Sequence, residues 1–443
     1  MGCGQGARLM RIAVVGSGIA GLASAWLLSR RHDVVLLEGN DSLGGHTHTH
    51  DIELEGKHYR VDTGFIVHNP ENYPLLTRMF DELGVATKPT TMSFSMHSDA
   101  SGVEYNATSL DGLFCQRGNL VSPRFWRMLG DLRRFYRLAP QLLQTSDAGP
   151  TLGEYLQQNS FGDAFRDEHL LPMASALWSS PSSQILSFPA RYLVQFMDNH
   201  HMLQVGGRPD WRVVCGGSSS YVEALQRQWN VEVRLGAPVL AVRRDAEGIE
   251  IATGDRSERF DQVVLACHSD QALALLADAD AREAEILGAI PYQSNDVVLH
   301  TDATLLPRNR KAWAAWNAHV PRDPSGACTV SYCMNLLQGI DAPQPLVVTL
   351  NRTAAIDPSR ILRRMAYSHP VYNHASVAAQ ARRHEIQGQR QTWFAGAYWG
   401  WGFHEDGIRS AVDVARGLGV HWDAAPAVAT MPNAAPLAAL APA

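Results

Sequence analysis

The sequence is poor in lysine, in closely spaced cysteines and in long apolar runs. Only Lys57, Lys88 and Lys311 are lysines, and the formal net charge of −6 argues against nucleic-acid binding. The six cysteines contain no Cys-x-x-Cys pair, which disfavours a zinc site or a disulfide framework. No apolar run approaches the roughly 20 residues that cross a bilayer, and the N-terminus lacks the apolar core of a signal peptide. These absences predict a cytoplasmic protein with reduced thiols.

The length and overall composition are those of a globular enzyme. At 443 residues the chain is long enough for two domains, and 45% apolar and 19% charged residues are ordinary values for such a protein. Residues 424–443 are rich in Ala and Pro and are predicted to form a disordered tail.

The N-terminal stretch RIAVVGSGIAGLASAWLLSRRHDVVLLE has the pattern of a strand, a helix and a second strand. Its apolar segments predict these elements over Ile12–Val15, Ile19–Ser29 and Val34–Leu37, with the carboxylate of Glu38 directly after the last one. Such a unit is typical of the Rossmann-like α/β class, in which helices cover a parallel sheet.

The turn between the first strand and the helix has the spacing Gly-x-Gly-x-x-Gly. The first glycine allows a tight turn, the second lets the backbone approach a pyrophosphate, and the third lets the helix pack on the sheet. The helix N-terminus offers free N–H groups to phosphates, and the acid is placed for the ribose. The predicted dinucleotide-binding residues are Gly16, Ser17, Gly18, Ile19, Ala20, Gly21 and Glu38. A second such motif is absent from the sequence, so a built-in NADPH domain is not expected.

The segment GGHTHTH at residues 44–50 contains three alternating histidines after a glycine pair. Alternation places His46, His48 and His50 on one face of a strand, where they could form a metal site. A metal site would also need a further ligand and supporting hydrogen bonds. Close approach to a cofactor explains the glycines better, so we expect His46 at the cofactor, His48 and His50 as polar strand residues, and no metal.

The acid, the Gly-Gly pair, the basic residue and the nearby Thr together resemble the FAD-dependent amine oxidase superfamily. The resemblance implies that FAD is the cofactor and that Gly44, Gly45, His46 and Thr47 lie beside it, with His46 in place of the usual arginine. The segment VDTGFIVHN, residues 61–69, resembles the stretch that returns to the flavin face in that family. This second likeness implies that Gly64 and Phe65 lie at the flavin.

Two later segments extend the same resemblance. The strand around Val239, within a helix–strand pattern, resembles the part of the FAD domain whose backbone meets the adenine, and DQVVLAC, residues 261–267, reads as a buried parallel strand. The segment TWFAGAYWGWGFHEDGIRSAVDVARGLG resembles the family's closing motif, a strand at Thr392–Ala395 and a helix at Gly407–Leu418. This likeness implies that the following residues lie at the flavin: Gly396, Ala397, Gly407 and Ile408.

The matching segments lie at both ends and in the middle of the chain. The resemblance therefore implies a discontinuous Rossmann-like FAD-binding domain of the glutathione-reductase/amine-oxidase type, over residues 10–85, 206–288 and 386–423. The remaining residues, 86–205 and 289–385, are expected to form an α+β substrate domain.

Residues 122–138 form an amphipathic pattern. Apolar and aromatic residues fall on about one third of a helical wheel, and five arginines with one aspartate fill the rest. Two interpretations stay open: the stripe packs on the substrate domain, or the helix contacts an anionic membrane or guards a lipid entrance.

The substrate segments and the closing motif supply candidates for the chemistry. Pro291–Asp302 and Lys311–Val320 predict strands, and an aromatic wall beside the flavin is expected from Trp316, Tyr398, Trp399, Trp401 and Phe403. His404 and Glu405 are the candidates for proton transfer, and Trp399 is a further catalytic candidate. The family's lysine near flavin N5 makes Lys311 a further candidate.

These observations predict a FAD-dependent oxidoreductase that transfers hydride from an apolar small molecule, such as an unsaturated or modified fatty acyl chain, to flavin N5. Three alternatives stay open: a flavin-dependent fatty acid isomerase without net oxidation, an amine oxidase, and a non-catalytic flavoprotein partner of a lipid-modifying enzyme. A location at the inner face of the membrane would accompany peripheral membrane contact.

Overall fold

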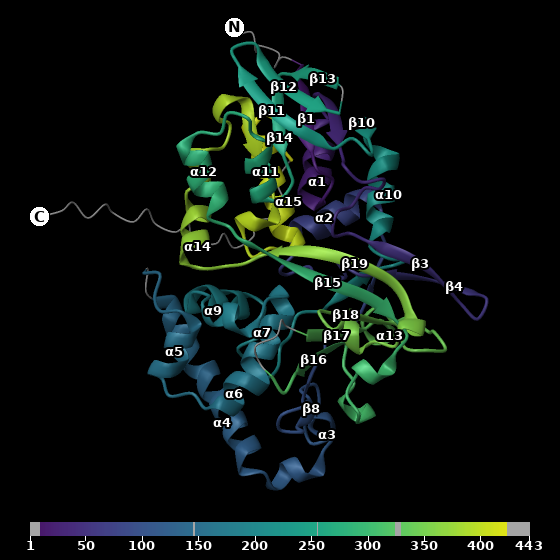
Figure 1. The fold of residues 1–443 in the computed structure, drawn as a ribbon, viewed down its shortest axis with the longest axis vertical. Helices are drawn as coiled ribbons and strands as arrows, with labels where there is room; N and C mark the ends of the chain where they lie inside the picture. Colours follow the sequence, from purple (N-terminus) through teal and green to yellow (C-terminus); the bar gives the residue numbers. More distant parts are fainter. Residues whose placement is uncertain (1–8, 145–146, 255, 324–328, 423–443) are drawn as a thin grey trace, which may run out of the picture.

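The computed structural model describes residues 9–144, 147–254, 256–323 and 329–422, so the predicted tail at 424–443 lies outside the described residues. Figure 1 shows the N-terminal unit at one end of the molecule, a group of helices at the other, and two long strands crossing between them. These long strands are β15 (Tyr292–His300) and β19 (Ile361–Pro370).

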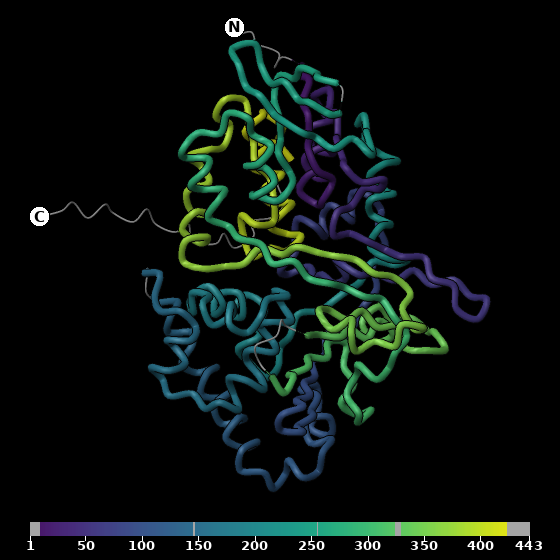
Figure 2. The backbone as a smooth tube through the Cα atoms, in the orientation of Figure 1, coloured from purple at the N-terminus to yellow at the C-terminus, as the bar shows by residue number. Residues whose placement is uncertain are grey.

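A five-stranded parallel sheet forms the upper part of the molecule in Figure 1. Its order is β10-β2-β1-β14-β20, and every neighbouring pair is parallel. Figure 2 shows that its strands come from the beginning, the middle and the end of the chain. They are β1 (Arg11–Val15), β2 (Asp33–Leu37), β10 (Val231–Arg234), β14 (Gln262–Leu265) and β20 (Thr392–Phe394). The predicted Rossmann-like α/β class is confirmed.

Both faces of this sheet are covered, which explains the nearly continuous apolar runs in its central strands β1, β2 and β14. One face packs against α1 (Ile19–Leu28), α2 (Pro74–Leu83), α10 (Ser219–Gln228) and α15 (His404–Gly417) in one core cluster. The other face packs against an antiparallel sheet and two helices. These are β11 (Val239–Asp245), β12 (Gly248–Thr253), β13 (Arg256–Phe260), α11 (Ser269–Leu275) and α12 (Ala281–Gly288).

A seven-stranded sheet lies below, in the order β19-β15-β18-β17-β16-β7-β8. Besides β15 and β19 it contains β7 (Phe94–Ser98), β8 (Glu104–Asn106), β16 (Trp316–Val320), β17 (Thr329–Cys333) and β18 (Val347–Leu350). The strand predicted at Lys311–Val320 therefore begins only at Trp316. The preceding residues form a 3-10 turn because Asn309 Oδ1 accepts a hydrogen bond from Lys311 N at 3.0 Å.

Smaller elements connect these layers. The strands are β3 (Thr49–Leu54), β4 (Lys57–Asp62), β5 (Val67–His68), β6 (Thr87–Pro89) and β9 (Arg212–Val214). The helices are α3 (Leu110–Leu113), α4 (Pro123–Leu138), α5 (Leu152–Gln158), α6 (Asp163–Phe165), α7 (Leu171–Trp178), α8 (Ser182–Leu186), α9 (Ala190–Asn199), α13 (Met334–Leu337) and α14 (His374–Ala381). The strands of each large sheet fall within the segments expected for one domain, and the exact division into domains stays a prediction.

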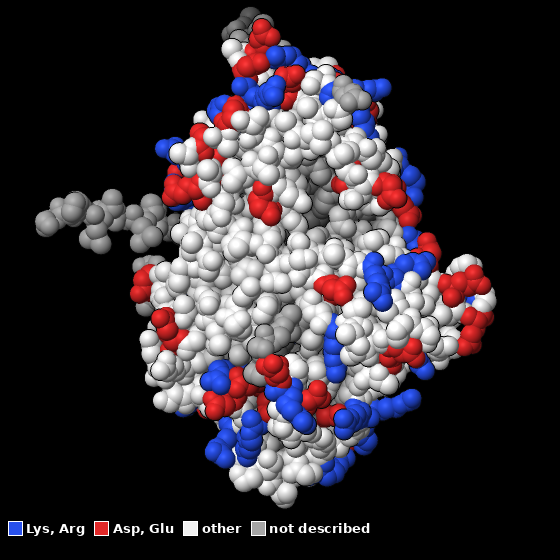
Figure 3. Space-filling model, in the orientation of Figure 1, with Lys and Arg blue, Asp and Glu red and all other residues white. Residues whose placement is uncertain are grey.

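The amphipathic helix α4 packs its apolar stripe inward. Phe125, Met128 and Phe135 are buried in a core cluster built mainly from α4 to α9, so the stripe is not available to a bilayer. One turn before Met128, the half-exposed side chain of Arg124 pairs with the buried carboxylate of Glu168. Figure 3 shows acidic and basic side chains next to one another at both ends of the molecule. Within the described ranges, no helix has the length and apolar character needed to cross a membrane.

Candidate functional site

The turn from β1 to α1 has the close contacts that its glycines predict. An added Cβ at Gly21 would lie 1.9 Å from the carbonyl oxygen of Gly16, because α1 starts directly against the turn. Gly16 itself has a φ of 97°, which favours glycine. At Gly18, by contrast, a Cβ would meet no described heavy atom within 4 Å. The turn is therefore tight on the protein side and open on the side where a pyrophosphate is predicted.

Glu38 holds this turn in place from the end of β2. Its Oε2 accepts hydrogen bonds from Ser17 N at 2.9 Å and Ser17 Oγ at 2.6 Å. Its Oε1 accepts from the backbone N–H and side-chain amide of Asn40, at 2.9 and 2.8 Å. A ribose hydroxyl binding to Glu38 would replace the Ser17 hydroxyl or the Asn40 amide.

The glycine pair Gly44–Gly45 packs against the turn between β1 and α1. Gly44 N donates to Ser17 O at 3.1 Å, and an added Cβ at Gly45 would lie 3.0 Å from Gly18 Cα. The third segment joins through Gly64, where a Cβ would lie only 2.0 Å from the carbonyl oxygen of His46. Three stretches far apart in the sequence therefore meet at one place.

His46 faces the cavity at this junction, and its Nε2 is buried without a hydrogen-bond partner among the described residues. Its ring lies 5.0 Å from Tyr367, 5.2 Å from His369 and 6.0 Å from His268, measured between centroids. Burial and these neighbouring histidines hold the pKa of His46 well below its ordinary value. The ring is therefore neutral near pH 7.

The rings of His48 and His50 lie next to each other, with centroids 4.1 Å apart and planes tilted by 40°. His48 Nδ1 lies 2.9 Å from the hydroxyl of Tyr367, and burial lowers the pKa of both histidines. A different group, His97, Asp99 and His319, has ligand atoms within 4.8 Å of one another. Burial lowers the pKa of its two histidines, and the charge of Arg352 beside the group lowers it further and opposes a bound cation.

The N-terminus of α15, in the closing motif, lies at the junction of the glycine segments. Gly407 packs on α1, where an added Cβ would lie 2.7 Å from Ile19 Cγ2, and Ile408 is buried in the same core. Gly396 N donates to Ser410 Oγ at 2.9 Å, which fixes the loop before the helix. Among the described residues, Gly396, Ala397 and His404 line the cavity, whereas Val239 does not.

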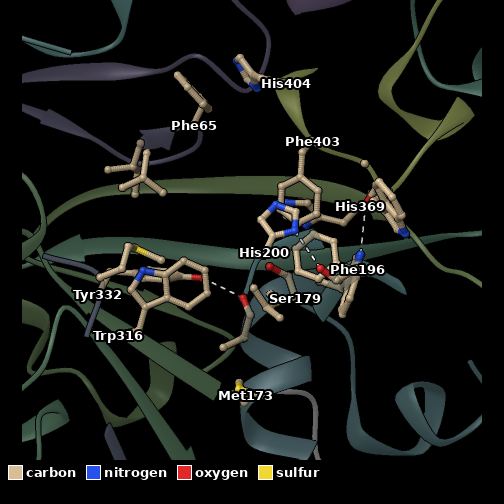
Figure 4. A pocket seen from close by; sticks show the side chains of 18 of the residues that line it. Phe65, Met173, Ser179, Phe196, His200, Trp316, Tyr332, His369, Phe403 and His404 are labelled. Carbon is tan, nitrogen blue, oxygen red and sulfur yellow. Dashed lines mark hydrogen bonds between the residues drawn. The ribbon is translucent and has the colours of Figure 1, made fainter. Parts of the chain in front are cut away.

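The cavity has a volume of about 730 Å³ and extends from these glycine segments to α4, α7 and α9. Apolar and aromatic side chains make up most of its wall, as expected for a small-molecule site. Figure 4 shows His404 and Phe65 on one side, Trp316 and Tyr332 on another, and a group of rings in which Phe196 stacks on both His200 and Phe403. Of the predicted aromatic wall, the following residues line the cavity: Trp316, Tyr398, Trp401 and Phe403.

His404 is held rigidly in the wall. Its ring stacks on Phe65 with centroids 3.7 Å apart, and its Nε2 lies 3.0 Å from Thr47 Oγ1 and 3.3 Å from the Tyr221 hydroxyl. Burial lowers the pKa of His404 to about 3, so the neutral ring is the form present near pH 7. It can share a hydrogen bond with the hydroxyl of Thr47 or Tyr221 but does not carry a charge at rest.

The other three catalytic candidates lie outside the cavity. The carboxylate of Glu405 accepts hydrogen bonds from Leu75 N and Leu76 N, both at 3.0 Å, and so caps α2; burial raises its pKa to about 7. Trp399 is buried in the core behind the wall and donates to the carbonyl of Phe394 at 3.0 Å. Lys311 is exposed and pairs with Asp111 at 2.9 Å. The structure does not bring these three side chains to the predicted reaction site.

Several cavity residues were not predicted from the sequence. Tyr367 and His369 alternate on β19 and both face His46, and this alternation is a signal the sequence does contain. His169, His200 and Arg208 come from the helical part, and no local pattern marks them as cavity residues. Only the packing of α4, α7 and α9 places them there.

Comparisons with known proteins agree with this architecture. No curated protein matches the sequence. Among solved structures, the CLA-producing fatty acid isomerase from P. acnes has a TM-score of 0.65 at 18% identity, covering 92% of this chain and 98% of that one. Cyclohexylamine oxidase from Brevibacterium oxydans IH-35A has a TM-score of 0.66 at 16% identity, covering 93% and 99%. Putrescine oxidase bound to putrescine also has a TM-score of 0.66, at 14% identity, covering 93% and 99%. At these identities the likeness shows the fold alone.

The family model described as flavin-containing amine oxidoreductase matches residues 19–333, well over half of the chain. The match includes α1, the glycine pair, the cavity residues of the helical part and most of the seven-stranded sheet. The chain belongs to the flavin-containing amine oxidoreductase family and is a FAD-dependent oxidoreductase.

Proposed function

We propose that this oxidoreductase acts on a long apolar substrate, an unsaturated or modified fatty acyl chain, bound in the cavity between the FAD segments and α4. The observation that carries the proposal is the wall of the cavity. Its inner part is built from side chains such as Met128, Leu132, Met173, Leu177 and Phe196, which exclude water and match a hydrocarbon chain.

The residues at the other end of the cavity fit FAD. The open face of Gly18, the buried free Nε2 of His46 and the contact of Gly45 with Gly18 leave a space bounded by backbone rather than side chains. We assign the pyrophosphate to Gly16–Gly18, the ribose to Glu38, and the flavin ring to His46, Gly64–Phe65, Gly396–Ala397 and the start of α15. When bound, FAD supplies the hydride acceptor.

The chain's own residues would orient the substrate and keep the site dry. His404, fixed by Phe65 and Thr47, presents a neutral ring at the cavity wall and can hold or pass a proton at Nε2. Tyr367 and His369 on β19 present further neutral polar groups opposite His46. None of the described carboxylates lines the cavity, so proton transfer would pass through histidine or tyrosine.

A fatty acid isomerase is the second candidate. The same apolar cavity supports it, and the fold is similar to that of a fatty acid isomerase from P. acnes. An isomerase moves a double bond without consuming an electron acceptor, whereas an oxidase produces a reduced acceptor such as hydrogen peroxide.

Anaerobic mixing of the holoprotein with candidate substrates tests the proposal. Oleate, linoleate, cyclohexylamine and putrescine would be added separately while the visible absorbance of the flavin is followed. Bleaching by a fatty acid supports oxidation, and a shifted double bond without net bleaching supports isomerisation. Bleaching by either amine with no response to either fatty acid would contradict the proposal.

A further inference from the structure

The cavity has a marked imbalance of charge. Arg208 is the one Arg, Lys, Asp or Glu among the described residues that line it. Burial lowers the pKa of His46, His169, His200 and His404, so these rings do not add charge near pH 7. A ligand in this cavity therefore meets a single positive group in otherwise neutral surroundings.

Arg208 lies beside two polar groups of the cavity wall. Its charge acts on the hydroxyl of Tyr136 on α4 and on the ring of His169, and all three residues line the cavity. Among the described residues, no carboxylate lies within salt-bridge distance of Arg208, unlike Arg124, which pairs with Glu168. Arg208 is an exposed residue that also lines the cavity, which places it at a mouth of the cavity.

The pair of Arg208 and Tyr136 has the donors that a carboxylate requires. A guanidinium presents several N–H donors in a planar fork, which matches the two oxygens of a carboxylate. The Tyr136 hydroxyl lines the same cavity and can donate its O–H to an anion. A second polar atom nearby, His169 Nε2, is buried without a partner among the described residues and lines the same cavity.

We infer that Arg208 and Tyr136 bind the carboxylate of a free fatty acid whose chain lies in the apolar cavity. This inference rests on the proposed function and makes it narrower: the substrate is the free acid, not an ester, a thioester or an amine. An alkylammonium group is disfavoured because it would meet a guanidinium of the same sign and no acidic side chain.

Binding of three chains with the same hydrocarbon part tests the inference. Oleate, methyl oleate and oleylamine would be titrated below their micellar concentrations into the holoprotein, with the change in the flavin spectrum as the readout. Oleate should bind at least about tenfold more tightly than methyl oleate, because only oleate can form charge-assisted hydrogen bonds to Arg208.

Four variants test whether the charge of Arg208 and the hydroxyl of Tyr136 determine the affinity for oleate. Arg208→Gln should lower the affinity for oleate to that for methyl oleate and leave the affinity for methyl oleate unchanged. Arg208→Lys should keep part of the preference for oleate over methyl oleate. Tyr136→Phe should weaken oleate by about threefold through loss of one neutral hydrogen bond. Arg208→Glu should reverse the order, so that oleylamine binds better than oleate. Arg127→Gln is the matched control, because Arg127 is an exposed arginine of α4 that does not line the cavity.

Each outcome counts for or against the inference. Equal binding of oleate and methyl oleate, unaffected by Arg208→Gln, would overturn the carboxylate assignment while leaving an apolar substrate in place. Preferred binding of oleylamine by the unchanged protein would overturn it as well. Failure of all three chains to bind would overturn the proposed function itself.

Discussion

The imidazole ring of His404 lies face to face with the phenyl ring of Phe65, with centroids 3.7 Å apart and planes inclined by 17°. The first residue of α15 is thereby joined to the segment that follows β4, across 339 positions of sequence. Thr47 Oγ1, 3.0 Å from His404 Nε2, adds the segment after the glycine pair. One neutral histidine therefore ties together three of the segments that the FAD assignment needs.

This burial makes the stability of the fold depend on pH through His404. Its pKa is lowered from 6.5 to about 3 in the folded protein. Below pH 6.5 the imidazole of His404 is therefore protonated in the unfolded chain but stays neutral in the folded one. Stability from this residue is fully present above pH 6.5 and is lost as the pH falls toward 3. We expect the free energy of unfolding, measured with urea on the holoprotein, to fall between about pH 6.5 and 4.5. This fall should be about 2 kcal/mol smaller in His404→Gln than in the unchanged protein.

The exposed His58 provides the control for this measurement. His58→Gln should leave the pH dependence as it is in the unchanged protein. An identical loss of stability in His404→Gln and the unchanged protein would show that His404 titrates normally in the folded chain.

Alanine substitutions at two glycines distinguish an effect on FAD binding from an effect on folding. At Gly18 an added Cβ meets nothing within 4 Å, so Gly18→Ala should cost less than about 1 kcal/mol of stability. The same Cβ would point into the space assigned to the pyrophosphate, so FAD should be lost on gel filtration. At Gly64 a Cβ would collide with the His46 carbonyl at 2.0 Å, and Gly64→Ala should destabilise the fold by about 2 kcal/mol or more. Full FAD retention by a folded Gly18→Ala variant would contradict the assignment.

Two aromatic residues of α4 distinguish core packing from membrane contact. Phe135 is fully buried, so Phe135→Ser should cost about 3–5 kcal/mol by the measure of large-to-small core substitutions. Trp126 is 51% exposed on the same helix, and Trp126→Ser should cost much less. Thermal unfolding compares the two. A small effect of Phe135→Ser on thermal stability, together with loss of vesicle binding, would show that the apolar stripe of α4 contacts a membrane and is not core.

The sequence was most informative where structure is set locally. The unit from β1 to Glu38 could be predicted within one residue at each boundary, because apolar periodicity, glycine spacing and the acid all lie within about 28 positions. The start of α15 was placed at Gly407 instead of His404. The difference arises because Asp406 accepts from Phe403 N at 3.1 Å and caps the helix one turn earlier.

The cavity could not be predicted in the same way. Lys311, the one lysine in a plausible region, pairs with Asp111 on the surface, and Glu405 caps α2. Arg208 and His169 reach the cavity only because α4, α7 and α9 pack together. Such long-range packing leaves no periodic signal in the sequence.

The central claim, an apolar chain held in the cavity beside FAD, is tested most directly by chain length. Saturated fatty acids of increasing length would be titrated into the holoprotein, and their dissociation constants read from the flavin spectrum. Each added methylene that enters the apolar part of the cavity should contribute about 0.8 kcal/mol, or roughly a fourfold gain in affinity, until the space not taken by the flavin is filled. The same affinity for short and long chains would contradict the account.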